Sequence, residues 1–336
     1  MSRIAFLRQI ARHTPGVVLS RFRRGPSRPS WSLDFELFTT ALRHTKLEVP
    51  RRDWKALRAL FDGLGHPLPF LVQDSPSLRR IHREETKVGG VPVTWFVPNT
   101  LGVTGSSAEV TLLYLHGGGY VFGSMATHGD LVARLALAAP ARALAPEYRL
   151  APEHPFPAAI DDVVAVYRAL LANGTEPKRL VVGGDSAGGG LTLALLQRLR
   201  DAGEPLPAGA VLISPWVDLT AKGGSVTENA AFDWMNEAIV QDWIETYLNG
   251  HDRRDPLVSP VYADLSGLPP LLIQVGGAEL LDDQIHVLAA RAREHGVDAR
   301  LVVEPDMIHA WHVFASLFSQ CGRAIDDVGA FVRSVT

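Results

Sequence analysis

The pattern of apolar and polar positions along the chain predicts an α/β fold. Short apolar runs, typical of buried strands, alternate with longer stretches in which apolar residues recur at helical spacing. Because parallel strands have to be joined by helices, this order favours a mostly parallel sheet with helices on both faces. The eight expected strands cover residues 81–88, 91–97, 111–115, 141–146, 180–183, 209–214, 271–275 and 299–304, and the first two form a hairpin at Gly89-Gly90.

Two segments do not fit the sheet. Residues 1–78 carry helical patterns at 31–44 and 52–64 and show no strand. Residues 219–255 lie between the sixth and seventh strands and are rich in aromatic residues. Ligands of open α/β sheets bind at the carboxyl ends of the strands. We therefore expect both segments to form a helical cap there, over a catalytic domain of residues 79–336.

The sequence Gly184-Asp185-Ser186-Ala187-Gly188 follows an expected strand and precedes a leucine-rich helical pattern. It fits the G-x-S-x-G elbow, in which a serine occupies a tight turn and glycines leave room for the crowded backbone. The elbow exposes the hydroxyl to a base that can activate it. We expect Ser186 to be a nucleophile. The alternative is a glycine-rich helix N-terminus that packs on the sheet or binds an anion.

A second glycine motif, His116-Gly117-Gly118-Gly119, follows the expected strand 111–115. Backbone N–H groups without side chains nearby can stabilise the oxyanion of an acyl-transfer transition state by about 3–4 kcal/mol per donor. We expect Gly117 and Gly118 to donate, with the N–H of Ala187 completing the oxyanion hole. The alternative for a glycine triplet is a flexible turn.

The base should be a histidine after the last strand, since the acid and the histidine follow the serine in hydrolases built on this elbow. His309 lies on a loop there, and His312 lies one turn later on an expected helix. We favour His309 as the base and interpret His312 as a structural histidine. The pair has no third ligand at a spacing that suggests a metal site.

The acid should lie on the loop after the strand at 271–275, where a carboxylate can fix the histidine tautomer and stabilise the imidazolium. Glu279 comes first on this loop and is the favoured candidate. Asp282 is second and, like Asp283, lies where a helix begins and a capping role would suit it. Asp218 and Asp306 are more distant candidates.

Composition excludes several classes of protein. The chain has 336 residues, a net charge of −3, 46% hydrophobic and 21% charged residues, which is ordinary for a globular protein and does not indicate nucleic-acid binding. No apolar run is long enough to cross a bilayer. The single cysteine, Cys321, excludes an internal disulfide and fits the reducing cytoplasm, where it would be an inert packed thiol.

The N-terminus is strongly basic. Residues 1–30 contain seven arginines and no acidic residue, and Ile4, Leu7, Ile10 and Ala11 share one helical face. Such a segment could be a targeting peptide or a helix on a membrane surface. The apolar run at 17–19 is too short for a signal peptide. We favour a basic amphipathic helix that covers the mouth of the substrate site.

These motifs resemble those of the bacterial hormone-sensitive-lipase family of carboxylesterases, which have the α/β-hydrolase fold and eight strands in this order. The resemblance spans about residues 80–335. It is carried by His116–Gly119, Tyr148–Ala159, Gly184–Gly189, Ser214–Trp216, Asp255–Pro260 and the loop around His309. We expect the run Tyr148–Ala159 to pack behind the oxyanion loop.

The chain departs from the family pattern at two positions. Glu279-Leu280-Leu281-Asp282-Asp283 stands where the family usually has aspartate followed by Pro-Leu-Arg-Asp-Glu. Aligned in this way Glu279 takes the acid position, 30 residues before His309 (309 − 279), as in the family. Met307-Ile308-His309 replaces the usual Met-Pro-His, a change that affects only backbone shape.

The resemblance implies hydrolysis of small-molecule esters with short to medium acyl chains, monoterpene lactones included, through an acyl-enzyme and without cofactor or metal. It also implies a homodimer that pairs through residues 299–304. Three alternatives remain: an amidase or peptidase on the same triad, a membrane-surface lipase, and a non-catalytic ligand-binding protein. Plant gibberellin receptors, which resemble this family, lack the catalytic histidine, so His309 argues against the last.

Aromatic residues are the candidates for the substrate pocket, with core or cap packing as the alternative for each. The six candidates are Trp31, Phe35, Phe38, Trp216, Phe232 and Trp234.

Overall fold

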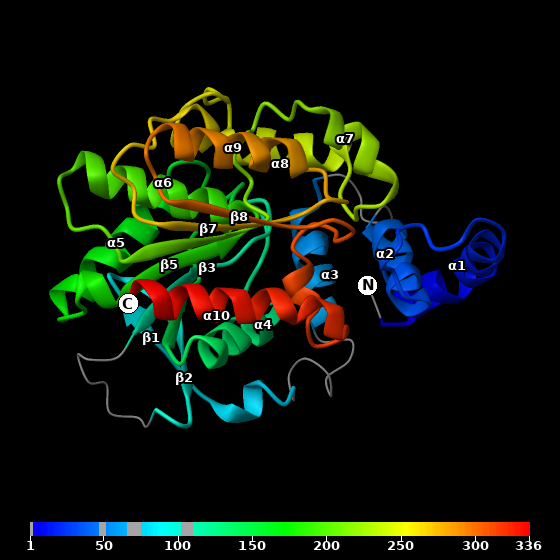
Figure 1. The fold of residues 1–336 in the computed structure, drawn as a ribbon, viewed down its shortest axis with the longest axis horizontal. Coiled ribbons are helices and arrows are strands. Elements are labelled where there is room, and N and C mark those ends of the chain that lie inside the picture. Colours follow the sequence, from blue (N-terminus) through cyan, green and yellow to red (C-terminus); the bar gives the residue numbers. More distant parts are fainter. Residues whose placement is uncertain (1–2, 47–51, 66–74, 102–109) are drawn as a thin grey trace.

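The computed structural model describes residues 3–46, 52–65, 75–101 and 110–336 of the chain. It contains an eight-stranded sheet in the order β1-β2-β4-β3-β5-β6-β7-β8 (Figure 1). The strands are β1 (Ile81–Val88), β2 (Val91–Pro98), β3 (Thr111–Leu115), β4 (Arg142–Pro146), β5 (Leu180–Asp185), β6 (Gly209–Ile213), β7 (Leu271–Gly276) and β8 (Ala299–Glu304). All eight expected strands are confirmed, with small changes at their ends.

The sheet is mostly parallel, as the sequence predicted. β1 pairs antiparallel with β2, and β2 pairs antiparallel with β4, whereas every other neighbouring pair is parallel. Strands β3, β5, β6 and β7 are buried along their whole length. Their continuous apolar runs are explained by helices on both faces, which leave no side of a central strand in water.

Helices cover the two faces unequally (Figure 1). One face carries α4 (Met125–Ala138) and α10 (Arg323–Val335), and the other carries α5 (Ala158–Ala172), α6 (Ala187–Asp201) and α9 (Asp282–Glu294). α10 shows why these sequences fold as they do, because its buried residues Ile325, Val328 and Val332 recur at helical spacing and form one apolar face. Cys321, just before α10, is a buried free thiol.

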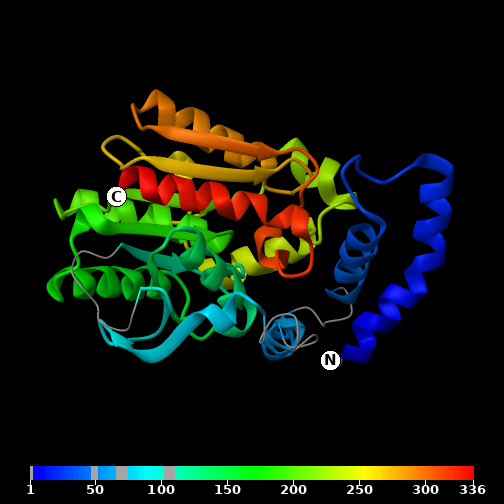
Figure 2. The same ribbon diagram turned by 60° about the horizontal axis from the view of Figure 1, so that its bottom comes forward.

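In its described ranges, 3–46 and 52–65, the N-terminal segment contains the helices α1 (Arg3–Arg24), α2 (Leu33–Lys46) and α3 (Trp54–Gly65). α2 and α3 match the two helical patterns expected in this part of the chain. The segment between β6 and β7 forms two further helices, α7 (Gly224–Glu228) and α8 (Glu237–Leu248). Figure 2 shows α1 beside α2, at the opposite end of the molecule from the C-terminus.

One face of α1 is fixed to α2 by three kinds of contact. The rings of Phe6 and Phe38 pack edge to face with their centroids 5.7 Å apart, and His13 stacks on His44 at 4.0 Å. Nη1 of Arg21 lies 2.7 Å from Oε2 of Glu36, which is almost fully buried. Within the described ranges, no helix is long and apolar enough to cross a membrane. The side chain of Ile4 is outside the described residues.

Candidate active site

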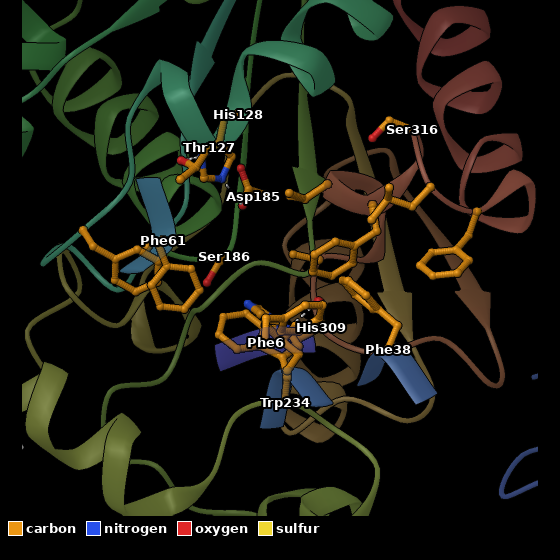
Figure 3. A pocket seen from close by; sticks show the side chains of 18 of the residues that line it. Phe6, Phe38, Phe61, Thr127, His128, Asp185, Ser186, Trp234, His309 and Ser316 are labelled. Carbon is orange, nitrogen blue, oxygen red and sulfur yellow. Dashed lines mark hydrogen bonds and ion pairs between the residues drawn. The ribbon is translucent and has the colours of Figure 1, made fainter. Parts of the chain in front are cut away.

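Ser186 lies in the turn between β5 and α6 with φ 54° and ψ −121°, a strained conformation for a residue with a side chain. The turn is crowded against β3. A Cβ on Gly188 would lie 1.9 Å from the carbonyl oxygen of Leu115, and one on Gly184 would lie 2.5 Å from it. Both glycines are therefore required. The Ser186 hydroxyl does not cap α6, although it occupies the N-cap position, and the side chain faces a cavity (Figure 3).

His309 lines the same cavity and lies against Glu279. Nδ1 of His309 and Oε1 of Glu279 are 3.4 Å apart, and both side chains are buried. The other carboxylate oxygen of Glu279 accepts hydrogen bonds from the Ser214 hydroxyl (2.7 Å) and the N–H of Gly276 (2.9 Å). These bonds fix the orientation of the carboxylate, so one oxygen stays directed at the imidazole.

The other candidates for the acid and the base lie in different environments. His312 is buried with Nε2 2.9 Å from Oε1 of Gln274, and burial lowers its pKa to about 3. The four remaining carboxylates contact other groups: Asp282 lies 3.3 Å from His286, Asp283 accepts from the Ser225 N–H, Asp218 accepts from the Tyr262 hydroxyl, and Asp306 accepts from the Ser30 N–H. The geometry brings only Glu279 to His309 among these candidates.

The pKa of His309 is raised above its ordinary value. Burial alone would lower this pKa, but the hydrogen bond and negative charge of Glu279 outweigh burial, and the charge of Asp233 adds to them. The imidazole is thereby a stronger base than a free histidine. Its Nε2 has no hydrogen-bond partner among the described residues, so it can accept a proton from a group in the cavity.

Asp233 is a carboxylate that sequence reasoning missed. It is fully buried, and Oδ1 accepts from the N–H of Trp234 (2.7 Å) and, more weakly, of His309 (3.4 Å). Oδ2 accepts from the N–H of Leu280 (2.8 Å). Asp233 thus connects the segment before α8 to the loops that carry both His309 and Glu279. Burial raises its pKa to about 6. No motif marks Asp233, since its partners are all backbone N–H groups and those of Leu280 and His309 are distant in sequence.

The expected set of oxyanion donors requires a correction. The N–H of Gly117 donates to Oδ1 of Asp185 at 3.0 Å, so it does not point into the cavity. Gly118 and Gly119 line the cavity instead, with φ 120° and 59°, and among the described residues no acceptor binds their N–H groups. The N–H of Ala187 opens α6, where the first amides have no partner within the helix.

Asp185 is the centre of a buried cluster behind this loop. Besides Gly117, Oδ1 accepts from the Tyr114 hydroxyl at 2.8 Å, and Oδ2 lies 3.3 Å from Nε2 of His128. Nδ1 of His128 lies 2.7 Å from Oγ1 of Thr127. Figure 3 shows His128, Thr127 and Asp185 on one side of Ser186 and His309 with Trp234 on the other.

The run Tyr148–Ala159 supports the oxyanion loop from behind, as expected. The Tyr148 ring stacks on His116 with centroids 4.3 Å apart, and its hydroxyl donates to the His116 carbonyl at 2.7 Å. The N–H of Ala151 donates to the carbonyl of Tyr120, just after the glycine triplet. The conformation of the triplet is therefore held by packing as well as by Asp185.

The cavity has a volume of about 670 Å³ and mostly apolar walls. Of the six expected aromatic residues, Phe38 and Trp234 line it. The other four do not line this cavity. Trp31 donates to the carbonyl of Asp306 and packs edge-on to Phe35, the Arg28 guanidinium covers Phe232 at 4.0 Å from the ring centroid, and Trp216 is buried near Tyr120 and Trp243.

The part of the cavity wall that was not predicted from the sequence comes from segments far apart in the chain. Its apolar members are Phe6, Leu7, Ile10, Leu37, Leu42, Phe61, Phe122, Trp243, Val313, Phe314, Leu317 and Phe318. The titratable lining residues are Asp34, His128, Asp185 and His309, and the described lining contains no lysine or arginine. In the ranges that the structure covers, no cluster of three or more histidine, cysteine or acidic side chains could hold a metal ion.

Comparison with known proteins identifies the family of the chain. A family model described as "alpha/beta hydrolase fold" matches residues 112–313. The chain is 49% identical over 227 residues to an acetyl-hydrolase of Streptomyces hygroscopicus, covering 67% of this chain and 76% of that protein. It is 36% identical over 232 residues to an esterase of Acinetobacter venetianus, covering 68% and 77%.

A crystal structure of an esterase from the bacterial hormone-sensitive lipase family superposes with a TM-score of 0.80 and 44% identity, over 88% of this chain and 95% of that one. The family model spans strands β4 to β8, the elbow and the loops of Glu279 and His309. The chain therefore belongs to the α/β-hydrolase family and, within it, to the bacterial hormone-sensitive-lipase family of carboxylic ester hydrolases.

Proposed function

We propose that the protein cleaves carboxylic esters by a two-step acyl transfer on Ser186, His309 and Glu279. The observation that carries this proposal is the arrangement of Glu279 at Nδ1 of His309, with Ser186 and His309 lining the same cavity. Nε2 of His309 accepts the proton of the Ser186 hydroxyl while Oγ attacks the ester carbonyl carbon. Glu279 holds the imidazole in the required tautomer and stabilises the imidazolium.

The oxyanion that forms in this step is bound by backbone N–H groups of Gly118, Gly119 and Ala187. Their positions are fixed before substrate binds, because Asp185 and Tyr148 hold the loop and α6 begins at Ala187. Preorganised donors of this kind stabilise a tetrahedral intermediate by about 3–4 kcal/mol each. His309 then protonates the leaving alkoxide, the C–O bond breaks, and the acyl group remains on Ser186.

Water completes the reaction. His309 removes a proton from a water molecule that attacks the acyl-enzyme, and the resulting tetrahedral intermediate collapses to release the carboxylic acid and Ser186. His309 returns the proton to Oγ, so the enzyme is regenerated without a cofactor.

The lining of the cavity is suited to uncharged, apolar ester substrates of medium chain length. Its apolar walls favour alkyl or aryl groups, and the absence of lysine and arginine from the described lining disfavours substrates with a free carboxylate. Cap residues contribute to this wall, since Phe6 and Phe38 come from α1 and α2, and Trp234 and Trp243 come from the segment between β6 and β7. We propose on this basis that residues 1–78 and 219–255 form a cap over the catalytic domain.

A series of p-nitrophenyl esters from acetate to decanoate, assayed with the wild type and the S186A variant, tests the proposal. We expect kcat/KM to peak at a medium chain, intact-protein mass spectrometry to detect an acyl adduct on the wild type, and S186A to show neither. A matched anilide and a lactone belong in the same series. Faster cleavage of the anilide than of the ester would favour an amidase and contradict the proposal.

β8 supports the proposed homodimer. It is an edge strand of the sheet, and Val303 on it is 39% exposed. An edge strand has unpaired N–H and C=O groups that can pair with a second copy. Light scattering should give twice the chain mass for the wild type and the chain mass for V303K. A monomeric wild type would contradict this part of the proposal.

A further inference from the structure

The outward face of α1 carries a continuous apolar stripe. Four of the eight large hydrophobic residues that are exposed among the described residues lie on this helix: Leu7 (59%), Val18 (44%), Leu19 (50%) and Phe22 (90%). Ala11 and Pro15 between them are exposed as well. We call these six residues the outer stripe. Phe6, His13 and Arg21 of α1 contact α2, and the six stripe residues remain exposed.

The spacing of the stripe shows that it is one surface. Positions 7, 11, 15, 18 and 22 follow one another at intervals of three or four residues, which places them on one side of an α-helix. Exposed apolar residues scattered singly need no explanation, but a contiguous apolar surface on a soluble domain indicates an interaction.

The charges beside the outer stripe indicate which kind of partner binds there. Arg8, Arg12 and Arg23 are exposed along its edge, and residues 1–30 contain no acidic side chain. A second copy of α1 on the stripe would bring two sets of arginines together, which is electrostatically unfavourable. An anionic phospholipid surface satisfies both features, because its acyl region takes up the apolar side chains and its phosphates pair with the arginines.

The outer stripe also reaches the active-site cavity. Leu7 belongs to the stripe and lines the cavity, together with Phe6 and Ile10 of the same helix. Figure 2 shows α1 at the end of the molecule, away from the sheet, where a planar surface could approach it. An apolar ester in a lipid layer under α1 would therefore meet Leu7, which lines the same cavity as Ser186.

We propose that the outer stripe of α1 docks the enzyme on anionic phospholipid surfaces and that the cavity takes its ester from that surface. The delivery of ester rests on the proposed function, whereas the docking does not require catalysis.

Vesicle co-sedimentation tests the docking directly. The S186A protein is mixed with vesicles of phosphatidylglycerol and phosphatidylcholine, or of phosphatidylcholine alone, so that no lipid is hydrolysed. We expect binding to the anionic vesicles and little binding to the neutral ones. Binding should weaken from about 0.1 M to about 1 M salt, as the Debye length falls from about 10 Å to about 3 Å.

Two pairs of variants separate the apolar and the charged contributions. V18S/F22S should weaken binding to anionic vesicles at least tenfold, because both side chains insert into the acyl boundary. V287S, at an exposed valine of α9, is the matched control and should bind like the parent protein. R8Q/R12Q should bind about 30-fold more weakly, given about 1 kcal/mol per basic residue near an anionic surface. R83Q, at an exposed arginine of β1, is its control.

Ester hydrolysis without vesicles separates the two proposals. With Ser186 intact, V18S/F22S should hydrolyse soluble p-nitrophenyl butyrate at the wild-type rate, since neither residue lines the cavity. Vesicle binding without any esterase activity would remove the proposed function and leave the docking standing. Equal vesicle binding by V18S/F22S and its parent would overturn the docking. The docking would also be overturned if the wild type did not bind vesicles and formed a dimer that the V18S/F22S substitutions abolished.

Discussion

Two buried histidine–carboxylate pairs flank Ser186, and they differ in what their second ring nitrogen does. On one side His309 lies 3.4 Å from Glu279, and on the other His128 lies 3.3 Å from Asp185. Both histidines line the cavity, and in both cases the pKa is raised because the carboxylate outweighs the effect of burial. Nδ1 of His128 is engaged by Thr127, whereas Nε2 of His309 has no partner in the described chain.

A histidine–carboxylate pair does not by itself make a catalytic base. His128 has both nitrogens in use, and its carboxylate also holds the Gly117 amide and the Tyr114 hydroxyl. That pair is suited to shaping the oxyanion loop. His309 keeps one nitrogen for a proton, and Glu279 uses its remaining oxygen only to fix its own position.

The largest effect is expected at Ser186 and His309, the proposed nucleophile and base. S186A and H309N should each lower kcat by about a millionfold, because either change removes the acyl-transfer pathway and leaves only binding and the oxyanion hole. Initial rates with p-nitrophenyl butyrate, at high enzyme concentration, measure this loss. Circular dichroism should show both variants folded. A rate above one-hundredth of wild type in folded H309N would assign the base to another residue.

The second-largest loss of kcat is expected at Glu279, the proposed acid. E279Q should lower kcat by about ten thousandfold, since a neutral amide can hold the wrong tautomer of His309 and does not stabilise the imidazolium. D282N is the matched control, because Asp282 lies beside His286 instead of His309. We expect D282N to retain kcat within a few fold. The reverse order of the two losses would transfer the acid role to Asp282.

The pH dependence of kcat/KM reports the same pair. His309 must be neutral to act as a base, so activity falls as the pH drops through its pKa. Because that pKa is raised, the acid limb of the wild type should have its midpoint above the ordinary histidine value of about 6.5. Removing the charge of Glu279 in E279Q should move the midpoint to lower pH. An unchanged midpoint would show that another group controls the limb.

Asp233 should give a smaller effect with a distinct signature. In D233N an amide NH₂ faces backbone N–H groups in place of a carboxylate oxygen, so the loops of His309 and Glu279 shift. A misplacement of this kind can lower kcat by up to about a hundredfold. The lost negative charge should also move the acid limb to lower pH, because Asp233 helps to raise the pKa of His309. A loss of thermal stability with kcat and pH profile unchanged would leave Asp233 a purely structural role.

The smallest catalytic effect is expected at the other histidine. H128Q keeps a donor near Asp185, and we expect kcat to fall less than tenfold while the free energy of unfolding falls by about 1–3 kcal/mol. Urea denaturation and ester hydrolysis on the same sample measure the two quantities. A kcat loss comparable to that of H309N would erase the difference between the two pairs.

The sequence predicted the turn around Ser186 because the constraints on this turn are local. Ser186 needs a strained turn, and the glycines that allow it lie within two residues, so a short motif records the geometry. The strands were equally readable, since buried parallel strands are continuous apolar runs. The position of the oxyanion loop could be predicted from the sequence, but the orientation of its amides could not. Which amide turns away depends on Asp185, a residue 68 positions from Gly117.

The residues that line the cavity and the contacts of Asp233 could not be predicted from the sequence, because packing between distant segments determines them. Phe6, Phe61 and Phe318 face one cavity although they are far apart in the chain, and nothing near them distinguishes them from core aromatics. Trp31 and Phe35 have the same helical pattern as Phe38, but they are covered by Phe232 and Phe318 and do not reach the cavity. Asp233 accepts hydrogen bonds from backbone amides, and the residue types that supply these amides do not indicate the contact.

The most direct test of the division between the two pairs is labelling with a fluorophosphonate, with the modified peptide identified by mass spectrometry. It requires no choice of substrate and responds to activation of the serine alone. We expect the wild type and H128Q to be labelled on Ser186 at similar rates, and folded H309N to be labelled hardly at all. Labelling of H309N at the wild-type rate, or its loss in folded H128Q, would contradict the assignment of His309 as the base.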